Sequence, residues 1–179
     1  RLLMMNPDSC ETKYNIDARV NSEVISINRD EKTVTVKHVL TGEQTTESYD
    51  KLILSPGASP IVPKLAGTEL PHVFTVRNVV DIERLQNAIV ENDAKSIAVI
   101  GGGFIGVEVA ENLRLAGRAV SLVEFAPQIL TPFDEDMVQI LHKEMVDQGV
   151  NLIVGDGLQE ITSTNITLNS GKQIEADIV

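Results

Sequence analysis

Residues 96–113 have the sequence SIAVIGGGFIGVEVAENL, in which an apolar run breaks into glycines and then resumes with a different period. The run at residues 97–100 is short, continuous and mostly branched, which is typical of a strand buried on both faces of a parallel sheet. Beyond the glycines the spacing of the apolar residues becomes helical. The helical set consists of Ile105, Val109, Leu113 and Ala116. The stretch therefore predicts a strand, a tight turn and a helix.

The glycines of this stretch follow the spacing G-x-G-x-x-G. In that spacing Gly101 permits the tight turn, Gly103 lets the backbone approach a pyrophosphate, and Gly106 lets the helix pack against the strand. The free N–H groups and the positive dipole end of the helix point at the loop, so an anion is expected there. A glycine-rich connection without a ligand is the alternative. The residues expected to contact a dinucleotide are Gly101, Gly102, Gly103, Phe104, Ile105 and Gly106.

The residues after the helix strengthen the prediction of dinucleotide binding. Gly117 ends the helix, residues 119–123 form a second strand, and Glu124 stands at the end of that strand. An acid about 20 residues beyond the glycine loop is expected to accept a hydrogen bond from the adenosine ribose 2′-hydroxyl. A carboxylate there also repels a 2′-phosphate, and residues 125–128 contain no Arg that would offset it. NAD(H) is therefore favoured over NADP(H).

The composition is that of an ordinary globular protein with an acidic balance. The 179 residues are enough to bury a core, and the formal net charge is −11 without any run of Lys or Arg. These features argue against a nucleic acid or an anionic membrane surface as a partner. No apolar stretch is long enough to span a bilayer, and the apolar start is too short for a signal peptide, so we expect a cytoplasmic protein.

Cysteine use and the chain ends add two expectations. Cys10 is the single cysteine, so it forms no internal disulfide and supplies no pair for a metal site or a redox C-x-x-C motif, and we expect no metal. The sequence opens without an initiator Met and closes on residues 176–179, which resemble the beginning of a strand. We therefore expect a fragment of a longer protein.

Short antiparallel β structure is expected on both sides of the central stretch. Apolar and polar residues alternate over residues 15–55, which is typical of β-strands. Three prolines then force an extended path over residues 55–63. The same short alternation returns after residue 158. A meander followed by an exiting strand thus occurs twice. The strands expected in the first copy are 17–20, 23–27, 33–39, 43–49 and 50–54.

Two further helices are expected around the central stretch. Asn78 or Asp81 can cap the first, and Asp134 can cap the second. After the second helix, residues 150–154 predict a third strand of the parallel type. The side chains expected to face the core are Ile82, Leu85 and Ile89 in the first helix and Met137, Ile140, Leu141 and Met145 in the second.

Three segments carry a resemblance to a known family. They are YDKLILSPGA at residues 49–58, FTVRN at residues 74–78 and GGGFIGVE at residues 101–108. Together they resemble the FAD-dependent pyridine nucleotide-disulfide oxidoreductases. Within these, the chain looks most like the branch of coenzyme A-disulfide reductases, NADH oxidases and NADH-dependent persulfide reductases, where Ser-Pro-Gly-Ala replaces the Ala-Thr-Gly of glutathione reductase relatives. The resemblance covers essentially the whole chain.

The resemblance implies a domain organisation. In this family an FAD domain and an NAD domain share the doubly wound design, and the NAD domain is inserted into the FAD domain. Residues 1–60 would then be the C-terminal part of the FAD-binding half, and residues 61–179 would be the NAD(P)-binding domain. The expected fold class is α/β, with a Rossmann-like doubly wound parallel sheet and an antiparallel β-meander, preceded by a β-meander remnant of the FAD-binding domain.

The resemblance also implies which residues hold the cofactors. Gly101, Gly103 and Gly106 would hold the NADH pyrophosphate, and Glu124 would hold its adenosine ribose. The segment formed by Ser55, Pro56 and Gly57 matches the crossover that runs beside the FAD in the family.

Two residues of the first helical turns become catalytic candidates through the resemblance. Phe104 matches the aromatic lid that covers the flavin until the nicotinamide displaces it. Glu108 matches a carboxylate that reaches the nicotinamide and flavin edge. Taken without the resemblance, Phe104 would be a partly buried aromatic residue and Glu108 a surface acid favoured by the helix dipole.

The implied reaction is hydride transfer from NADH to FAD, followed by transfer of electron pairs to a cysteine or to oxygen. The flavin glycine loop and the redox cysteine would lie before Arg1, Cys10 is outside the redox motif, and the dimerisation domain would follow Val179. We therefore expect this chain to bind NAD(H) and to catalyse nothing alone, within a parent that is a homodimer. The electron acceptor stays open among coenzyme A disulfide, a persulfide and oxygen.

Two other functions are compatible with a dinucleotide loop. A two-domain NAD-dependent dehydrogenase would need a catalytic His or Lys near the nicotinamide, and none of His38, His72 and His142 is placed to supply one. A non-enzymatic NADH-sensing module would instead use binding to shift a partner interface. A flavin glycine loop and a cysteine in the flanking coding sequence would exclude both.

Overall fold

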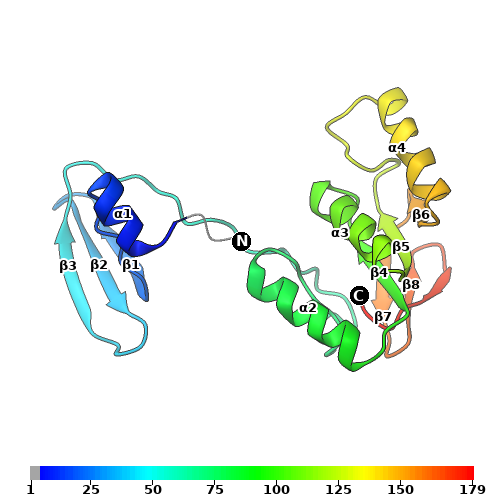
Figure 1. The fold of residues 1–179 in the computed structure, drawn as a ribbon, viewed down its shortest axis with the longest axis horizontal. Helices are drawn as coiled ribbons and strands as arrows, with labels where there is room; N and C mark the ends of the chain where they lie inside the picture. The colour runs from blue at the N-terminus through cyan, green and yellow to red at the C-terminus, as the bar shows by residue number, and fades with distance from the viewer. Residues whose placement is uncertain (1–4) are drawn as a thin grey trace. The chain divides into compact units, whose positions relative to one another are not determined.

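The computed structural model describes residues 5–179 and has the mixed α/β architecture expected from the sequence (Figure 1). The chain forms two compact units, the first ending at Gly57 and the second beginning at Ala58.

The first unit is a small antiparallel sheet preceded by a helix. The sheet has the order β1-β2-β3, with antiparallel pairing at both interfaces. The helix α1 was not expected, although its signals are local, since the side chain of Asn6 accepts from the N–H of Ser9 and a proline opens the helix. The elements are α1 (Pro7–Tyr14), β1 (Ser22–Asn28), β2 (Thr33–His38) and β3 (Gln44–Ser48).

Two expected strands of the first unit do not form. Residues 17–20 and residues 50–54 are in neither helix nor strand. Both segments have strand-like composition, but no strand of residues 5–57 pairs with them, and a strand forms only where its backbone groups find a neighbouring strand. The chain from residue 51 to residue 65 therefore continues as an irregular, largely exposed connection.

The second unit is built on a three-stranded parallel sheet of order β4-β5-β6. One helix connects each pair of neighbouring strands, which gives two consecutive βαβ units. A further helix precedes the sheet and is capped by Asn78, as expected. The elements are α2 (Val79–Glu91), β4 (Ser96–Ile100), α3 (Phe104–Leu115), β5 (Ala119–Glu124), α4 (Glu135–Asp147) and β6 (Asn151–Val154).

A second antiparallel meander, of order β7-β8-β9, completes the second unit. It covers one face of the parallel sheet, because Ala98 and Val123 share a core with its apolar residues. The opposite face, represented by Ile97 and Leu122, packs against the helices. The meander consists of β7 (Leu158–Ile161), β8 (Asn165–Leu168) and β9 (Gln173–Glu175).

The chain after β9 joins the parallel sheet. Ile178 lies beside Ile97 in a parallel bridge, and the N–H of Ala98 donates to the carbonyl of Ile178 at 2.9 Å. The carboxylate of Asp177 accepts from the N–H of Lys95 at 2.7 Å and from the N–H of Ser96 at 2.8 Å. These bonds tie the end of the second meander to the beginning of β4.

The buried face of α4 differs from the expected one. Met145 is buried and Leu141 is half-buried, but Met137 and Ile140 are exposed at 61% and 69%. The core face instead includes Val138, which is buried. Leu141 and Met145 follow it by three and seven residues, so the three side chains lie on one face of the helix. In α2 the same kind of shift leaves Ile82 exposed while Ile89 is buried.

Candidate functional site

The glycine loop connects β4 to α3, and two of its glycines are required by the fold. Gly101 has φ +105°, a left-handed conformation that side chains disfavour. A Cβ on Gly106 would lie 1.9 Å from the carbonyl oxygen of Gly101. Any side chain at Gly106 would therefore push the first turn of α3 away from the loop, as expected for the glycine that permits close packing.

Gly103 is a glycine for a different reason. A Cβ built on Gly103 would have no protein atom within 4 Å, and its backbone is extended at φ −74° and ψ −178°. Nothing within the described residues 5–179 demands a glycine here, and the absence of a side chain leaves space open beside the loop. A pyrophosphate that approaches the backbone needs this kind of space.

The N-terminus of α3 is open to a ligand. Gly103 is the N-cap of α3 and makes no side-chain cap, whereas in α2 the side chain of Asn78 accepts from the N–H of Asp81. The first-turn N–H groups of a helix have no partner inside the helix and carry the positive end of its dipole. The loop thus presents backbone donors and positive potential next to the space at Gly103.

Glu124 is bonded directly to the glycine loop. One carboxylate oxygen accepts from the N–H of Gly102 at 2.6 Å, and the other accepts from the N–H of Ala126 at 2.7 Å. The sequence identified the position of Glu124 at the end of β5 but not these two bonds. A carboxylate has about four acceptor sites, so Glu124 can hold the loop and still accept from a ribose hydroxyl.

Gly102 is buried, and both of its backbone polar groups are hydrogen-bonded within the chain. Its carbonyl accepts from the N–H of Leu130 at 2.8 Å, and its N–H is taken by Glu124. A Cβ here would lie 2.5 Å from Cγ2 of Ile129, a side chain with 0% exposure. Gly102 therefore connects the glycine loop to the segment 126–133 rather than facing the open space.

Phe104 and Glu108 lie on consecutive turns of α3. Both are exposed, and residues four apart in a helix share a face. The ring of Phe104 contacts the ring of Phe133 edge to face, with centroids 5.9 Å apart. Sequence reasoning missed Phe133, whose only local signal is an aromatic residue just before the cap of α4.

An apolar groove of about 610 Å³ runs through the second unit beside these residues. The glycine loop and the start of α3 form one part of its wall, through residues such as Gly103 and Phe104. The remaining wall includes residues 60–63, residues 73–76 and the parallel strand β4. The groove thus combines an apolar lining with the backbone donors of a helix N-terminus, a combination suited to a dinucleotide.

Three of the expected site residues belong to the first unit. Ser55, Pro56 and Gly57 are exposed residues at the end of the first unit, outside its helix and strands. Cys10 is a free cysteine on α1. Among residues 5–179 the side chains of His, Cys, Asp and Glu form no cluster that could hold a metal ion. Within the same residues, no helix has both the length and the apolar character required to cross a bilayer.

The second unit has the features of a Rossmann-type α/β protein. These are the parallel βαβ units, the glycine loop, the helix without a side-chain cap and the acid at the end of β5. The sequence profile of the pyridine nucleotide-disulphide oxidoreductases matches residues 7–179. The chain therefore belongs to this family.

Individual relatives agree with the resemblance found in the sequence. An NADH oxidase of Enterococcus faecalis is 33% identical over 186 residues, which cover 99% of this chain and 41% of the relative. A coenzyme A disulfide reductase of Staphylococcus haemolyticus is 33% identical over 178 residues, which cover 99% of this chain and 40% of the relative. The solved structure of reduced Bacillus anthracis CoADR-RHD matches with a TM-score of 0.93 and 44% identity, over 99% of this chain and 32% of that chain.

The family, the branch and the α/β fold class expected from the sequence are thus confirmed. The chain spans about two-fifths of the length of the curated relatives named above, at 41% and 40%.

Proposed function

We propose that the chain is the NAD(H)-binding portion of a flavoprotein oxidoreductase that transfers hydride from NADH to FAD. The observation that carries the proposal is the open space at Gly103 beside the uncapped N-terminus of α3. In the proposed domain organisation, residues 1–60 belong to the FAD-binding half and residues 61–179 form the NAD(P)-binding domain. Family membership favours this function over a two-domain dehydrogenase and over a sensing module.

The geometry of the loop fits an NADH pyrophosphate and ribose. Gly101 and Gly106 shape the loop, Gly103 admits the pyrophosphate, and Glu124 accepts from the adenosine ribose. A 2′-phosphate would approach a carboxylate that cannot turn away without leaving the N–H of buried Gly102 unpaired. NADH is therefore the proposed substrate in preference to NADPH.

Phe104 and Glu108 are the residues proposed to face the reacting end of NADH, since both project from the α3 turns next to the loop. The crossover Ser55, Pro56 and Gly57 is proposed to run beside FAD in the whole protein. The two cofactors supply the redox chemistry, while the protein holds and orients them and excludes water. Because residues 5–179 contain one loop of this kind, we expect the chain alone to bind NADH without turning it over.

The acceptor, assembly and location of the whole protein belong to the same proposal. Relatives named as an NADH oxidase and as a coenzyme A disulfide reductase support oxygen or coenzyme A disulfide as the acceptor. A persulfide is the third acceptor that the resemblance implies. We further propose a homodimer, as the resemblance implies, and a location in the cytoplasm, as the sequence leads us to expect.

The test is calorimetric titration of this chain with NADH and with NADPH, using the variants Gly103→Ala and Gly103→Val. Each larger side chain fills more of the space at Gly103, so we expect the loss of NADH affinity to grow, by about 5- to 150-fold for valine. Both variants should still fold, because a Cβ at Gly103 has no protein atom within 4 Å, and thermal melts check this; only the preference for glycine at the N-cap is lost. A folded wild-type chain that binds neither dinucleotide, or a valine variant that binds NADH normally, contradicts the proposal.

Glu124→Ala provides the ribose test. The alanine removes a carboxylate that also accepts from the N–H groups of Gly102 and Ala126. We therefore expect NADH affinity to fall and the preference over NADPH to shrink, rather than a simple exchange of one dinucleotide for the other. An unchanged ratio of the two affinities would show that Glu124 does not contact the ribose.

A further inference from the structure

Phe104 has an aromatic neighbour that lies outside the glycine loop. Its ring and that of Phe133 pack edge to face, with an interplanar angle of 72°. The two residues are 63% and 51% exposed, so the contact is at the surface. The chain has only four Phe and two Tyr, which makes a surface pair beside the candidate site a feature to explain.

Phe133 belongs to a segment that is hydrogen-bonded to the glycine loop. Within residues 126–133, the N–H of Leu130 donates to the carbonyl of Gly102, and buried Ile129 fills the space beside that glycine. The N–H of Phe133 then donates to the carbonyl of Leu130 at 2.9 Å. The rings of Phe104 and Phe133 are therefore carried by two segments that are hydrogen-bonded and packed against each other.

Further bonds hold the segment in one conformation. The side-chain amide of Gln128 donates to the carbonyl of Phe133 at 2.9 Å, and the N–H of Ile129 donates to Nε2 of His142 at 3.3 Å. Leu130 has φ +47°, a conformation that residues other than glycine rarely adopt. The backbone under Phe133 is thus well fixed while its ring remains exposed, which suits a ring that serves as a contact surface.

Phe104 stands between this contact and the groove. It lines the groove, whereas Phe133 is not among the groove residues. The groove is open in the orientation in which the ring of Phe104 contacts Phe133, and any other orientation requires rotation about the side-chain bonds of Phe104. In the structure it contacts Phe133.

We infer that Phe133 is a positioning residue, which holds the ring of Phe104 to one side and so keeps the dinucleotide groove accessible. This inference rests on the proposed function, since it assigns the groove to NADH. An edge-to-face pair of this kind favours the held orientation by about 2- to 10-fold. Loss of Phe133 lowers the fraction of molecules that are competent to bind, and the apparent affinity falls by the same factor.

The test is a double-mutant cycle on the full 179-residue chain, with NADH dissociation constants for the wild type, Phe133→Ala, Phe104→Ala and the double variant. We expect Phe133→Ala to weaken NADH binding by up to about 10-fold when Phe104 is present and to have no effect when it is absent. Phe133→Tyr keeps the ring and should restore wild-type affinity. An equal loss in both backgrounds, or no loss in either, overturns the inference.

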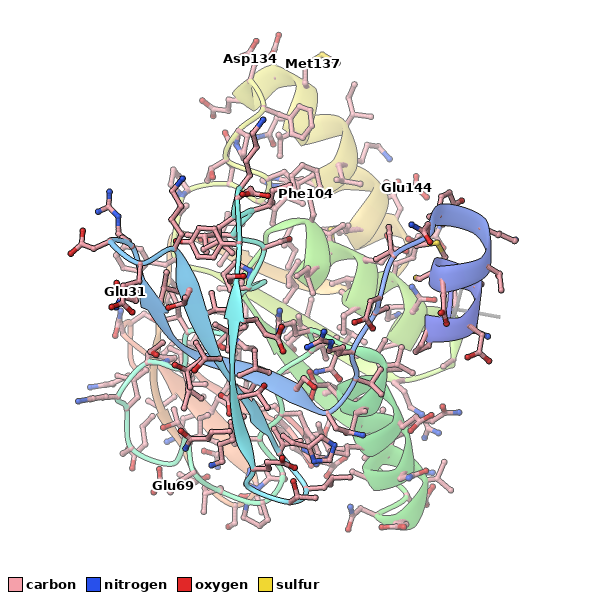
Figure 2. All side chains as sticks on the ribbon, turned by 90° about the vertical axis from the view of Figure 1, so that its left-hand side faces the viewer. Glu31, Glu69, Phe104, Asp134, Met137 and Glu144 are labelled. Atoms are coloured by element: carbon pink, nitrogen blue, oxygen red, sulfur yellow. The ribbon has the colours of Figure 1, made fainter. Side chains whose placement is uncertain are left out.

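Met137→Ala is the matched control, since Met137 is an exposed apolar residue in the first turn of α4, four positions after Phe133 (Figure 2). It should leave NADH affinity unchanged. Thermal melts of all variants check that folding is retained. The NMR signals of the Phe104 ring provide a readout that needs no ligand, and they should shift in Phe133→Ala but not in Met137→Ala. Unchanged Phe104 signals would show that the rings do not interact, whereas a wild-type chain that binds no NADH would overturn the proposed function itself.

Discussion

The two meanders of this protein have the same local design and different surroundings. Both are three-stranded antiparallel sheets in simple sequential order. In the first, apolar residues such as Val24 and Ile27 remain exposed. In the second, Ile166 and Leu168 have 0% exposure. The difference arises because the second meander lies on a parallel sheet that contributes Ala98 and Val123 to a shared core.

This contrast shows that alternation of apolar and polar residues does not fix what a strand contributes to stability. A three-stranded sheet gains free energy mainly by burying one face. The second meander does so within its own unit. Within residues 5–57 the first meander has helix α1 as its only companion element, and no side chain of α1 is buried.

The largest expected effect is on the core of the second meander. Leu168→Ala should reduce the free energy of unfolding by about 2–5 kcal/mol, because it leaves a cavity in a fully buried site. Ile27→Ala in the first meander should change it by less than about 0.5 kcal/mol, because Ile27 is exposed. Urea unfolding followed by circular dichroism measures both. Equal effects would remove the distinction between the meanders.

The next largest effect on stability is expected from a comparison of two loop glycines in the second unit, one closely packed and one with open space beside it. Gly106→Ala should cost about 1–3 kcal/mol, because the new Cβ would overlap a backbone oxygen that cannot rotate away. Gly103→Ala should cost less than about 1 kcal/mol, because its Cβ meets no protein atom and only the N-cap preference for glycine is lost. Thermal melts of the two variants provide the comparison. A large loss in the Gly103 variant would show that this position is packed in solution.

A smaller effect is expected where the second meander joins β4. Asp177→Ala removes the acceptor of the Lys95 and Ser96 N–H groups and should cost about 1 kcal/mol, since water can reach these groups. The backbone N–H groups of Ser96 and then Lys95 lower the pKa of Asp177 from its ordinary value of 3.8.

This pKa shift fixes the direction of the pH dependence. Because the folded pKa of Asp177 lies below the unfolded one, the stabilisation is complete above the ordinary pKa and is lost as pH falls through the folded value. Between pH 7 and about pH 3 the wild type should therefore lose more stability than Asp177→Ala. Chemical unfolding at a series of pH values measures the difference, and parallel pH curves would contradict the assignment.

The smallest effect is expected in the first unit. Arg19 forms ion pairs with Asp17 and Glu47, each at 2.8 Å, and all three side chains are well exposed. Such pairs are screened by water and salt, so Arg19→Ala should leave the unfolding curve unchanged within error. A clear, salt-dependent loss would indicate that the first meander depends on this cluster.

Local sequence determined much of this protein. The glycine spacing predicted the β4, loop and α3 arrangement because φ preferences and steric limits act within a few residues, as Gly101 and Gly106 show. Of the two residues expected to cap α2, Asn78 or Asp81, Asn78 is the N-cap, and this signal is local for the same reason. The ligand roles of the loop residues and of Glu124, Phe104 and Glu108 stay predictions for the titrations to decide.

Only the tertiary structure decided which strands form, which faces are buried and what surrounds the loop. Residues 50–54 have a strand-like sequence but no partner, and α4 turns Val138 inward and Met137 outward. The bonds of Glu124 to Gly102 and the contact of Phe133 with Phe104 join residues 22 and 29 positions apart. Pairing and burial depend on segments that are distant in the chain, so no local pattern encodes them.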